Sequence, residues 1–414
     1  MSGEKPAARP KRSPSASARA SVRAPALRES PEREGMNSLR ALWDFGRLSV
    51  HDLLWPGQSR GSSVQPLDAH LVAALKWLCL AQDVNGTGGF SYGYSARGGW
   101  REPYRETTGY IIPTFLRAAA QLARPDLKTR AFRAADWLVS VQNRDGSICN
   151  PRYGSAGLVF DTGQVLFGFV SAYRNSGEQR YLEAALRAGD WLAGIADSDG
   201  LWTRSEHFDT AHVYNTRTAW ALLTLNKIAN NANYARISRA NLDWALSNQV
   251  ESGLFSNAAF RKGDRPYTHN ISYSICGLQE SGWLLGEARY CDAARKAADA
   301  CLRLMRPSGS IPGQISPDAK SLARYTCLTG NCQLAIVWSR LFGKSGDIAY
   351  QRAARQSLAF VMRHQRMDDA PSSAVGAIAG SFPIWGRYAP LSFPNWAAKF
   401  FVDAALLQRR WAIS

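Results

Sequence analysis

The sequence lacks a long apolar segment. Apolar runs such as 334–338 are soon broken by polar residues, and none approaches the roughly 18 residues that a membrane-crossing helix needs. The first 35 residues carry positive charge, but the apolar stretch that completes a signal peptide is missing. We therefore expect no transmembrane segment and a cytoplasmic location.

Paired cysteines are also missing. The seven cysteines are scattered along the chain, and no Cys-x-x-Cys spacing occurs. This odd number without pairing motifs predicts buried, reduced thiols. No convincing zinc set of cysteine and histidine is present, so we expect neither a metal nor another cofactor.

Acidic residues are few. The chain has 33 Asp and Glu against 50 Lys and Arg, for a net charge of +17. Such an excess favours anionic partners such as nucleic acid, anionic lipid or acidic polysaccharide, although a generally arginine-rich proteome would produce the same charge. Residues 1–35, rich in Ala, Ser, Pro and Arg, are expected to form a disordered basic tail. Residues 36–64 form a lead-in, and 65–414 a single folded unit.

A tryptophan followed nine residues later by a glycine recurs along this unit. The pattern starts at Trp77, Trp137, Trp191 and Trp244, continues with Ala300 in place of the tryptophan, and ends in a degraded copy at Phe360. The steps are 60, 54, 53, 56 and 60 residues. Such a period corresponds to one helical hairpin and a loop. We expect the tryptophans to be packing residues of outer helices.

Six more apolar helices alternate with these outer helices. Their expected ranges are 107–122, 161–174, 215–229, 270–285, 331–342 and 395–407. Because these helices are apolar on both faces, they predict an all-α (α/α)6 toroid of six helical hairpins with a disordered N-terminal tail. An open solenoid is the alternative, since hairpin repeats can stack without closing.

The inner helices of a toroid run parallel, so their N-termini meet at one rim. Capping explains many polar residues there, but not the Tyr, His, Arg, Gln and Trp that follow. We expect catalytic residues among Glu106, Asp161, Asp209, His212, Tyr214, His269 and Tyr273, with His207 and Tyr325 as further acid–base groups. The candidates for substrate binding are Tyr94, Trp100, Arg101, Arg105, Gln164, Arg217, Asn270, Arg324, Tyr325, Asn331, Trp385, Tyr388, Asn395 and Lys399.

These residues fit two chemistries. Hydrolysis of a glycosidic bond needs two carboxyl groups across the bond, which Glu106 with Asp161 or Asp209 would supply. Removal of a proton next to a uronate carboxylate needs a base, an acid on the other face and a group that stabilises the enolate. His, Tyr and Arg residues would supply these.

The sequence resembles three groups of proteins. Residues 133–147 (RAADWLVSVQNRDGS) resemble the repeat of terpene cyclases and protein prenyltransferase β subunits, although the Asp-rich protonating motif of squalene-type cyclases is absent. Residues 160–173, 181–185 and 269–279 are similar to carbohydrate-active toroids: unsaturated glucuronyl hydrolases, N-acylglucosamine 2-epimerases and the C-terminal domain of glucuronyl C5-epimerases. That domain normally follows a β domain, whereas here we expect only the short disordered tail ahead of the toroid. Residues 380–404 resemble proteins that accompany glycosyltransferases in bacterial exopolysaccharide gene clusters.

These resemblances imply an enzyme of bacterial polysaccharide biosynthesis. The expected substrate is an acidic oligo- or polysaccharide containing uronic acid, or its lipid-linked or nucleotide-linked precursor, and the expected reaction is C5-epimerisation or a related proton abstraction. The alternatives are a glycoside hydrolase with two carboxyl groups, a non-catalytic glycan-binding toroid and a terpenoid-cyclase-like enzyme. No nucleic-acid partner is expected.

Overall fold

The computed structural model describes residues 46, 50, 52, 65–367 and 372–413. The chain divides into two compact units, residues 1–33 and 34–414, and every described residue belongs to the second. The predicted tail (1–35) and most of the lead-in (36–64) therefore lie outside the described residues.

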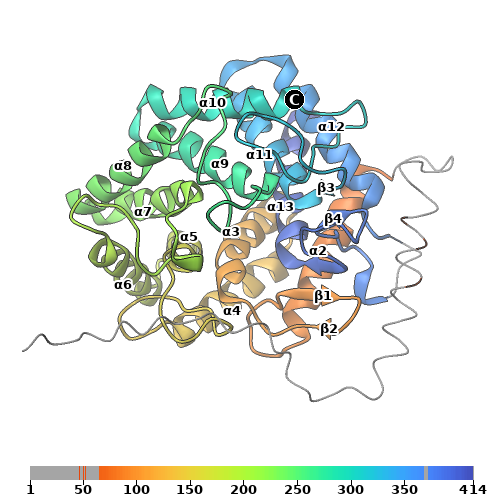
Figure 1. Cartoon of the computed structure of the whole chain (residues 1–414). Helices are drawn as coiled ribbons and strands as arrows, with labels where there is room; N and C mark the ends of the chain where they lie inside the picture. Colours follow the sequence, from red (N-terminus) through yellow and green to blue (C-terminus); the bar gives the residue numbers. More distant parts are fainter. Residues whose placement is uncertain (1–45, 47–49, 51, 53–64, 368–371, 414) are drawn as a thin grey trace, which may run out of the picture. The chain divides into compact units, whose positions relative to one another are not determined.

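Twelve α-helices make up the described part of the second unit, and they alternate between an outer and an inner ring (Figure 1). The outer helices are α2 (Leu67–Asp83), α4 (Pro125–Val141), α6 (Gln179–Ile195), α8 (Ala232–Ser247), α10 (Ala288–Arg303) and α12 (Ile348–His364). The inner helices are α3 (Arg105–Leu122), α5 (Val159–Ser176), α7 (Thr216–Ala229), α9 (Thr268–Leu285), α11 (Leu328–Ser345) and α13 (Asn395–Ile413).

The inner helices form a closed ring. Each contacts the next in sequence, and α13 contacts both α3 and the first outer helix, α2. The loops before the first and last inner helices also meet, because β1 (Gly93–Ser95) pairs with both β2 (Gly99–Trp100) and β5 (Ser392–Pro394). A second small sheet joins β3 (Thr326–Cys327) to β4 (Ser381–Phe382). The predicted (α/α)6 toroid is confirmed, and the open solenoid is excluded.

In every copy but the first, the repeated glycine packs its loop against the next outer helix, and in the first loop Gly88 makes this contact instead. The glycines nine residues past the repeat position all have positive φ, which glycine adopts without strain; they are Gly86, Gly146, Gly200, Gly253 and Gly309. A Cβ on Gly146 would lie 2.3 Å from the main-chain oxygen of Arg187, in the next outer helix. In the last loop a Cβ on Gly376 would lie 2.2 Å from the oxygen of Ala73 in α2, so the same contact closes the ring.

A tyrosine–aspartate contact joins successive outer helices. The Tyr181 hydroxyl in α6 donates a hydrogen bond of 2.7 Å to Asp136, the residue before Trp137 in α4. The equivalent pairs are Tyr234–Asp190, Tyr290–Asp243 and Tyr350–Asp299. The outer ring is thus held by a repeated polar contact as well as by apolar packing.

The inner helices begin near their predicted starts, but capping does not explain the residues there. Glu106 and Asp161 lie inside the first turns of α3 and α5, and the caps of these two helices are Tyr104 and Leu158, which make no side-chain capping hydrogen bond. The capping explanation is therefore wrong for these positions.

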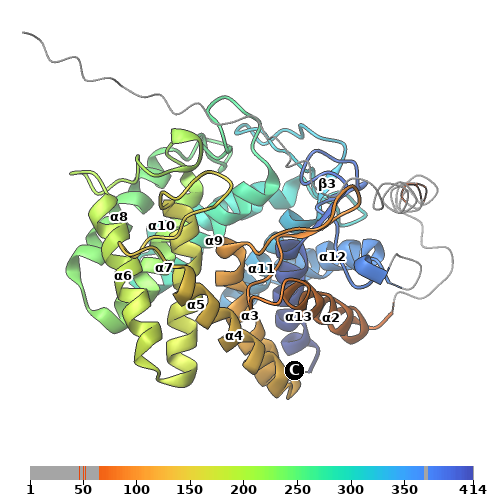
Figure 2. The same cartoon turned by 90° about the horizontal axis from the view of Figure 1, so that it is seen from below.

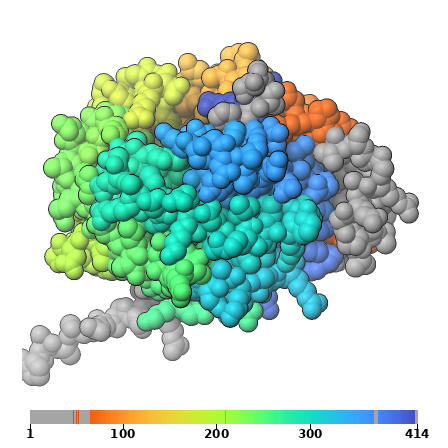
Figure 3. All heavy atoms as spheres, turned by 90° about the horizontal axis from the view of Figure 1, so that it is seen from above, coloured from red at the N-terminus to blue at the C-terminus, as the bar shows by residue number. Residues whose placement is uncertain are grey.

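Figure 2 shows the ring at right angles to the first view, and the outer helices α10 and α12 cover the side seen in Figure 3. In the described part of the chain, no helix is long and apolar enough to cross a membrane.

Candidate active site

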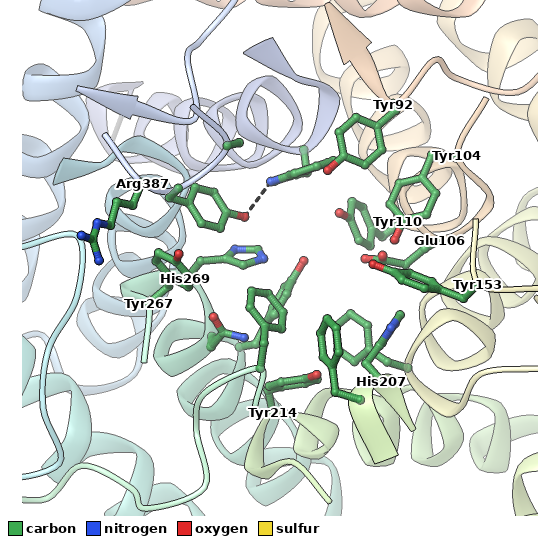
Figure 4. Close-up of a pocket in the computed structure, with 18 residues that line it drawn as sticks. Tyr92, Tyr104, Glu106, Tyr110, Tyr153, His207, Tyr214, Tyr267, His269 and Arg387 are labelled. Carbon is green, nitrogen blue, oxygen red and sulfur yellow. Dashed lines mark hydrogen bonds between the residues drawn. The ribbon is translucent and has the colours of Figure 1, made fainter. Parts of the chain in front are cut away.

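A pocket of about 1000 Å³, including its open mouth, lies where the first turns of the inner helices meet the long loops (Figure 4). Five polar residues line it: Glu106, His207, His269, Asn270 and Arg387. Twelve aromatic residues line it: Tyr92, Tyr104, Tyr110, Tyr153, Phe160, Phe208, Tyr214, Phe260, Tyr267, Tyr273, Tyr388 and Trp396. The pocket is therefore aromatic, with a few polar groups on its walls.

Glu106 is the carboxyl group on one wall. It lies in the first turn of α3 and is 8% exposed. Burial, reinforced by the charge of Asp161 on the neighbouring helix α5, raises the pKa of Glu106 to about 8, against smaller opposing effects of Tyr104, His207 and Arg217. Glu106 is therefore mostly protonated at neutral pH and able to act as an acid.

Asp161 supports this wall from behind. Its side chain is fully buried and does not line the pocket. Its Oδ1 lies 2.8 Å from Nε2 of His207, whereas its Oδ2 has no partner among the described residues. Burial works against a charged His207, but the Asp161 carboxylate outweighs it, so the pKa of His207 is raised. The two residues form an ion pair next to Glu106.

His269 stands on the opposite wall, facing Glu106 across the cavity (Figure 4). Its Nδ1 lies 3.0 Å from Oε1 of Gln333. With the amide in this orientation Nδ1 carries the proton, and Nε2 keeps its lone pair. Burial lowers the pKa of His269 to about 3. The imidazole is therefore neutral and can accept a proton.

Two buried polar side chains on the pocket wall, the hydroxyl of Tyr214 and the amide of Asn270, have no hydrogen-bond partner among the described residues. The hydroxyl of Tyr273 interacts with that of Tyr110, but its own proton has no acceptor among these residues. Asn270 and Tyr273 lie one turn apart on α9, while Tyr214 belongs to the short 3-10 segment Val213–Asn215 that packs against α9. Because buried polar groups are almost always hydrogen-bonded, these groups predict a polar ligand.

A buried arginine lies beneath this wall. The Arg217 guanidinium carbon lies 5.0 Å from the ring centroid of Tyr273 and 5.7 Å from that of Tyr110. The Nε donates to Oε1 of Gln164 at 2.7 Å, and no carboxylate among the described residues lies within the 4.0 Å of an ion pair. A buried charge without a counter-ion favours a negative group in the cavity above it.

Most of the remaining predicted residues whose side chains are described lie outside the pocket. His212 has its two ring nitrogens against main-chain oxygens of Ala259 and His207 and stacks on Tyr214. For Asp209 the structure describes the main chain only, in the segment His207–Asp209. Of the substrate-binding candidates, only Asn270 and Tyr388 line the pocket.

Several of the other candidates make internal contacts. Asn331 donates to the Gly309 oxygen, and Asn395 to the Ser91 oxygen. The ring of Trp100 packs on that of Trp77, and Arg105 donates a hydrogen bond to the sulfur of Cys149. Gln164 accepts a hydrogen bond from Arg217, and Lys399 forms an ion pair with Asp403. Tyr94 packs on Trp100, and Tyr325 packs against Gly313 and Gly386. Arg101, Arg324 and Trp385 lie in the loops around the mouth, with Arg324 and Trp385 exposed.

Sequence reasoning missed most of the aromatic lining. Tyr104, Tyr153, Tyr267 and Arg387 come from loops whose lengths differ between repeats. One signal was present for Tyr110, which follows Glu106 by four residues just as Tyr273 follows His269. That spacing places both members of each pair on one face of a helix.

The chain is similar to several known toroids. Residues 101–289, less than half of the chain, match the squalene-hopene cyclase C-terminal domain family. An unsaturated glucuronyl hydrolase from Bacillus sp. GL1 superposes with a TM-score of 0.67 at 13% identity, over 83% of this chain and 97% of that chain. A cellobiose 2-epimerase from Bacillus thermoamylovorans gives 0.65 at 11% identity, over 84% and 99%.

A polysaccharide lyase gives a TM-score of 0.62 at 13% identity, over 84% of this chain and 98% of that chain. No curated protein sequence matches the chain. At these identities the likeness establishes the fold alone, an α/α toroid like that of these carbohydrate-active enzymes.

Proposed function

We propose that this protein is a carbohydrate-active enzyme that removes the proton next to the carboxylate of a uronic acid in a glycan. The reaction is C5-epimerisation or the related β-elimination. The observation that carries the proposal is that Glu106 and His269 face each other across one pocket. Burial favours the protonated form of Glu106 and the neutral form of His269 there. An acid and a base that face each other across a sugar ring are what inversion at C5 requires.

In the proposed reaction the lone pair of His269 Nε2 takes the C5 proton. The electrons of the C–H bond move into the sugar carboxylate, which becomes an enediolate. Glu106 then donates its proton to C5 from the other face, which inverts this carbon and leaves a Glu106 carboxylate and a His269 imidazolium. In the elimination Glu106 instead protonates the oxygen that leaves C4. The carboxylate of the bound substrate raises the pKa of His269 and so strengthens it as a base.

The carboxylate would bind at Tyr214, Asn270 and Tyr273. Their hydroxyl and amide protons have no other acceptor among the described residues, and the charge of Arg217 lies beneath Tyr273. Donors placed where negative charge develops lower the barrier most, because they need no reorganisation during the reaction.

The same polar groups argue against a terpenoid substrate. The similarity to squalene-hopene cyclases and the twelve aromatic rings would both suit a carbocation. A hydrocarbon chain, however, would leave the hydroxyl of Tyr214 and the amide of Asn270 buried and unpaired, which costs several kcal/mol in total. A glycan offers partners to both groups.

Glycoside hydrolysis is the second candidate. The electrostatic interaction between Glu106 and Asp161 favours it, since two neighbouring carboxyl groups in different protonation states are the usual pair for this reaction. The burial of Asp161 behind the wall, with His207 as its partner, favours the first reaction instead. A role in bacterial polysaccharide biosynthesis is part of the proposal and rests on the resemblance of residues 380–404. The cytoplasmic location expected from the sequence is also part of the proposal.

The reaction is tested by incubating the protein with glucuronate-containing oligosaccharides in deuterated water. Deuterium at C5, or a new C4–C5 double bond, supports proton abstraction. New reducing ends without deuterium at C5 and without unsaturation favour hydrolysis and overturn the proposed proton abstraction. Binding without any product indicates a non-catalytic glycan-binding toroid and overturns both reactions.

A further inference from the structure

Four arginines surround the mouth of the pocket: Arg101, Arg152, Arg261 and Arg387, referred to here as the mouth arginines. They come from the loops that precede α3, α5, α9 and α13. Arg387 lines the pocket itself. The guanidinium of Arg152 lies 4.4 Å from the ring centroid of Tyr92, and that of Arg261 lies 4.5 Å from the ring centroid of Phe208. Both rings line the pocket, so these charges stand at its mouth.

No acidic side chain that the structure describes pairs with a mouth arginine. Among the described residues no carboxylate oxygen lies within 4.0 Å of any of them, although exposed acidic residues are close in sequence at Glu102 and Asp264. Several arginines on or next to the outer helices are paired, for example Arg130 with Asp83 at 2.8 Å. A group of uncompensated cations around one opening attracts and concentrates anions.

Exposed aromatic rings lie in the loops at the same rim of the ring. In the described part of the chain, the aromatic side chains that count as exposed are Tyr153, Phe208 and Trp385, at 55%, 37% and 45%. All three lie in loops that lead into inner helices, and Tyr153 and Phe208 line the pocket. Aromatic faces beside cations suit a chain that carries both sugar rings and negative charges.

We infer that the mouth arginines and these rings bind the sugars on either side of the reacting residue, so that the substrate is an acidic polymer and not a single sugar or its nucleotide. This inference rests on the proposed function and specifies its substrate class. Tyr110 and Tyr273 line the pocket on the side where their rings pack on the buried Arg217. A chain whose reacting sugar lies between Glu106 and His269 must therefore leave through the mouth. Its neighbouring uronates then lie beside the mouth arginines.

The test measures affinity against chain length. Hyaluronan oligosaccharides, in which glucuronate alternates with N-acetylglucosamine, are titrated into the full-length protein by calorimetry, from a disaccharide to a dodecasaccharide. We expect the dodecasaccharide to bind at least about tenfold more tightly than the disaccharide, with a gain that shrinks as salt screens the charges. Equal affinities for short and long chains would overturn the inference.

Substitutions test whether the mouth arginines cause the tighter binding of longer oligosaccharides. Arg152→Gln and Arg261→Gln should each weaken binding of the dodecasaccharide about two- to fivefold, with little change for the disaccharide. Arg355→Gln is the matched control, because it removes one exposed arginine from the outer helix α12. If the control weakens binding as much as the mouth variants, the charge acts non-specifically and the mouth has no special role.

Two further outcomes are distinguished. Single-stranded DNA is the second probe, since bases also stack on aromatic rings. If it binds as tightly as the dodecasaccharide and depends equally on Arg152 and Arg261, the assignment to a glycan fails. If binding depends on chain length but no exchange occurs at C5, the proposed reaction is contradicted and this inference stands. If exchange occurs at a rate independent of chain length, the proposed reaction stands and this inference is contradicted.

Discussion

Replacement of Glu106 by glutamine should stabilise the protein at neutral pH. The carboxyl is buried, and its pKa rises from 4.5 to about 8. Above pH 4.5 the unfolded chain releases this proton, while the folded protein keeps it until the pH approaches 8. The folded state therefore loses stability as the pH rises through this window. Glutamine has a similar shape and never ionises, so Glu106→Gln does not carry this cost.

The size of the effect follows from the pKa. At 1.36 kcal/mol per pH unit, the full rise corresponds to about 5 kcal/mol, of which about 3 kcal/mol applies at pH 7. The free energy of unfolding of Glu106→Gln should thus equal that of the wild type near pH 4. It should exceed the wild-type value by about 3 kcal/mol at pH 7 and by about 5 kcal/mol above pH 8.

Urea unfolding followed by circular dichroism at pH 4, 7 and 9 measures this difference. If unfolding is irreversible, melting temperatures measured at one scan rate are compared in place of the free energies of unfolding. Glu102→Gln is the control, because Glu102 is exposed and lies only four residues away; its difference from the wild type should be small at every pH. A difference between Glu106→Gln and the wild type that does not change with pH would refute the assignment of a raised pKa to Glu106.

The other predictions concern the outer ring and the site. Tyr290→Phe removes the hydrogen bond of 2.6 Å to Asp243 and should lower the free energy of unfolding by about 1 kcal/mol, as measured by urea titration; an unchanged value would mean that the tyrosine–aspartate contacts do not hold the ring. Inversion at C5 should slow as the pH rises above about 8, because Glu106 loses the proton that it delivers to the other face; a pH–rate profile for inversion that stays flat to pH 10 would contradict this. Tyr273→Phe should slow exchange at C5 by about 10²- to 10³-fold while the affinity for a neutral oligosaccharide stays unchanged. If this affinity falls as much as the exchange rate, the role of Tyr273 is structural.

The repeat in the sequence predicted the architecture and the position of the pocket. Each inner helix must start where its hairpin turns inward, so the Trp–Gly spacing located Glu106, Tyr214 and His269 at a common rim. Asn331 and Asn395 start their helices at the same rim but do not line the pocket, because position in the repeat does not decide what a side chain faces. Both amides donate to main-chain oxygens of neighbouring loops.

The loops could not be predicted in the same way. His207 reaches Asp161 from 46 positions further along the chain, in a segment where Phe208 has a φ of 60°. No periodicity governs such a loop, so its contacts depend on packing that appears only in the folded ring. The partners of Glu106, and hence its protonation state, were for this reason visible only in the structure.

The central claim is that Glu106 and His269 act on opposite faces of one sugar. Its most direct measurement is the fate of C5 in a glucuronate oligosaccharide treated in deuterated water with Glu106→Gln and with His269→Gln, followed by NMR. In Glu106→Gln the proton can still leave and return on the His269 face, so we expect deuterium at C5 with unchanged configuration. In His269→Gln we expect neither deuterium nor inversion. Inverted product from Glu106→Gln, or deuterium at the wild-type rate from His269→Gln, would contradict the account.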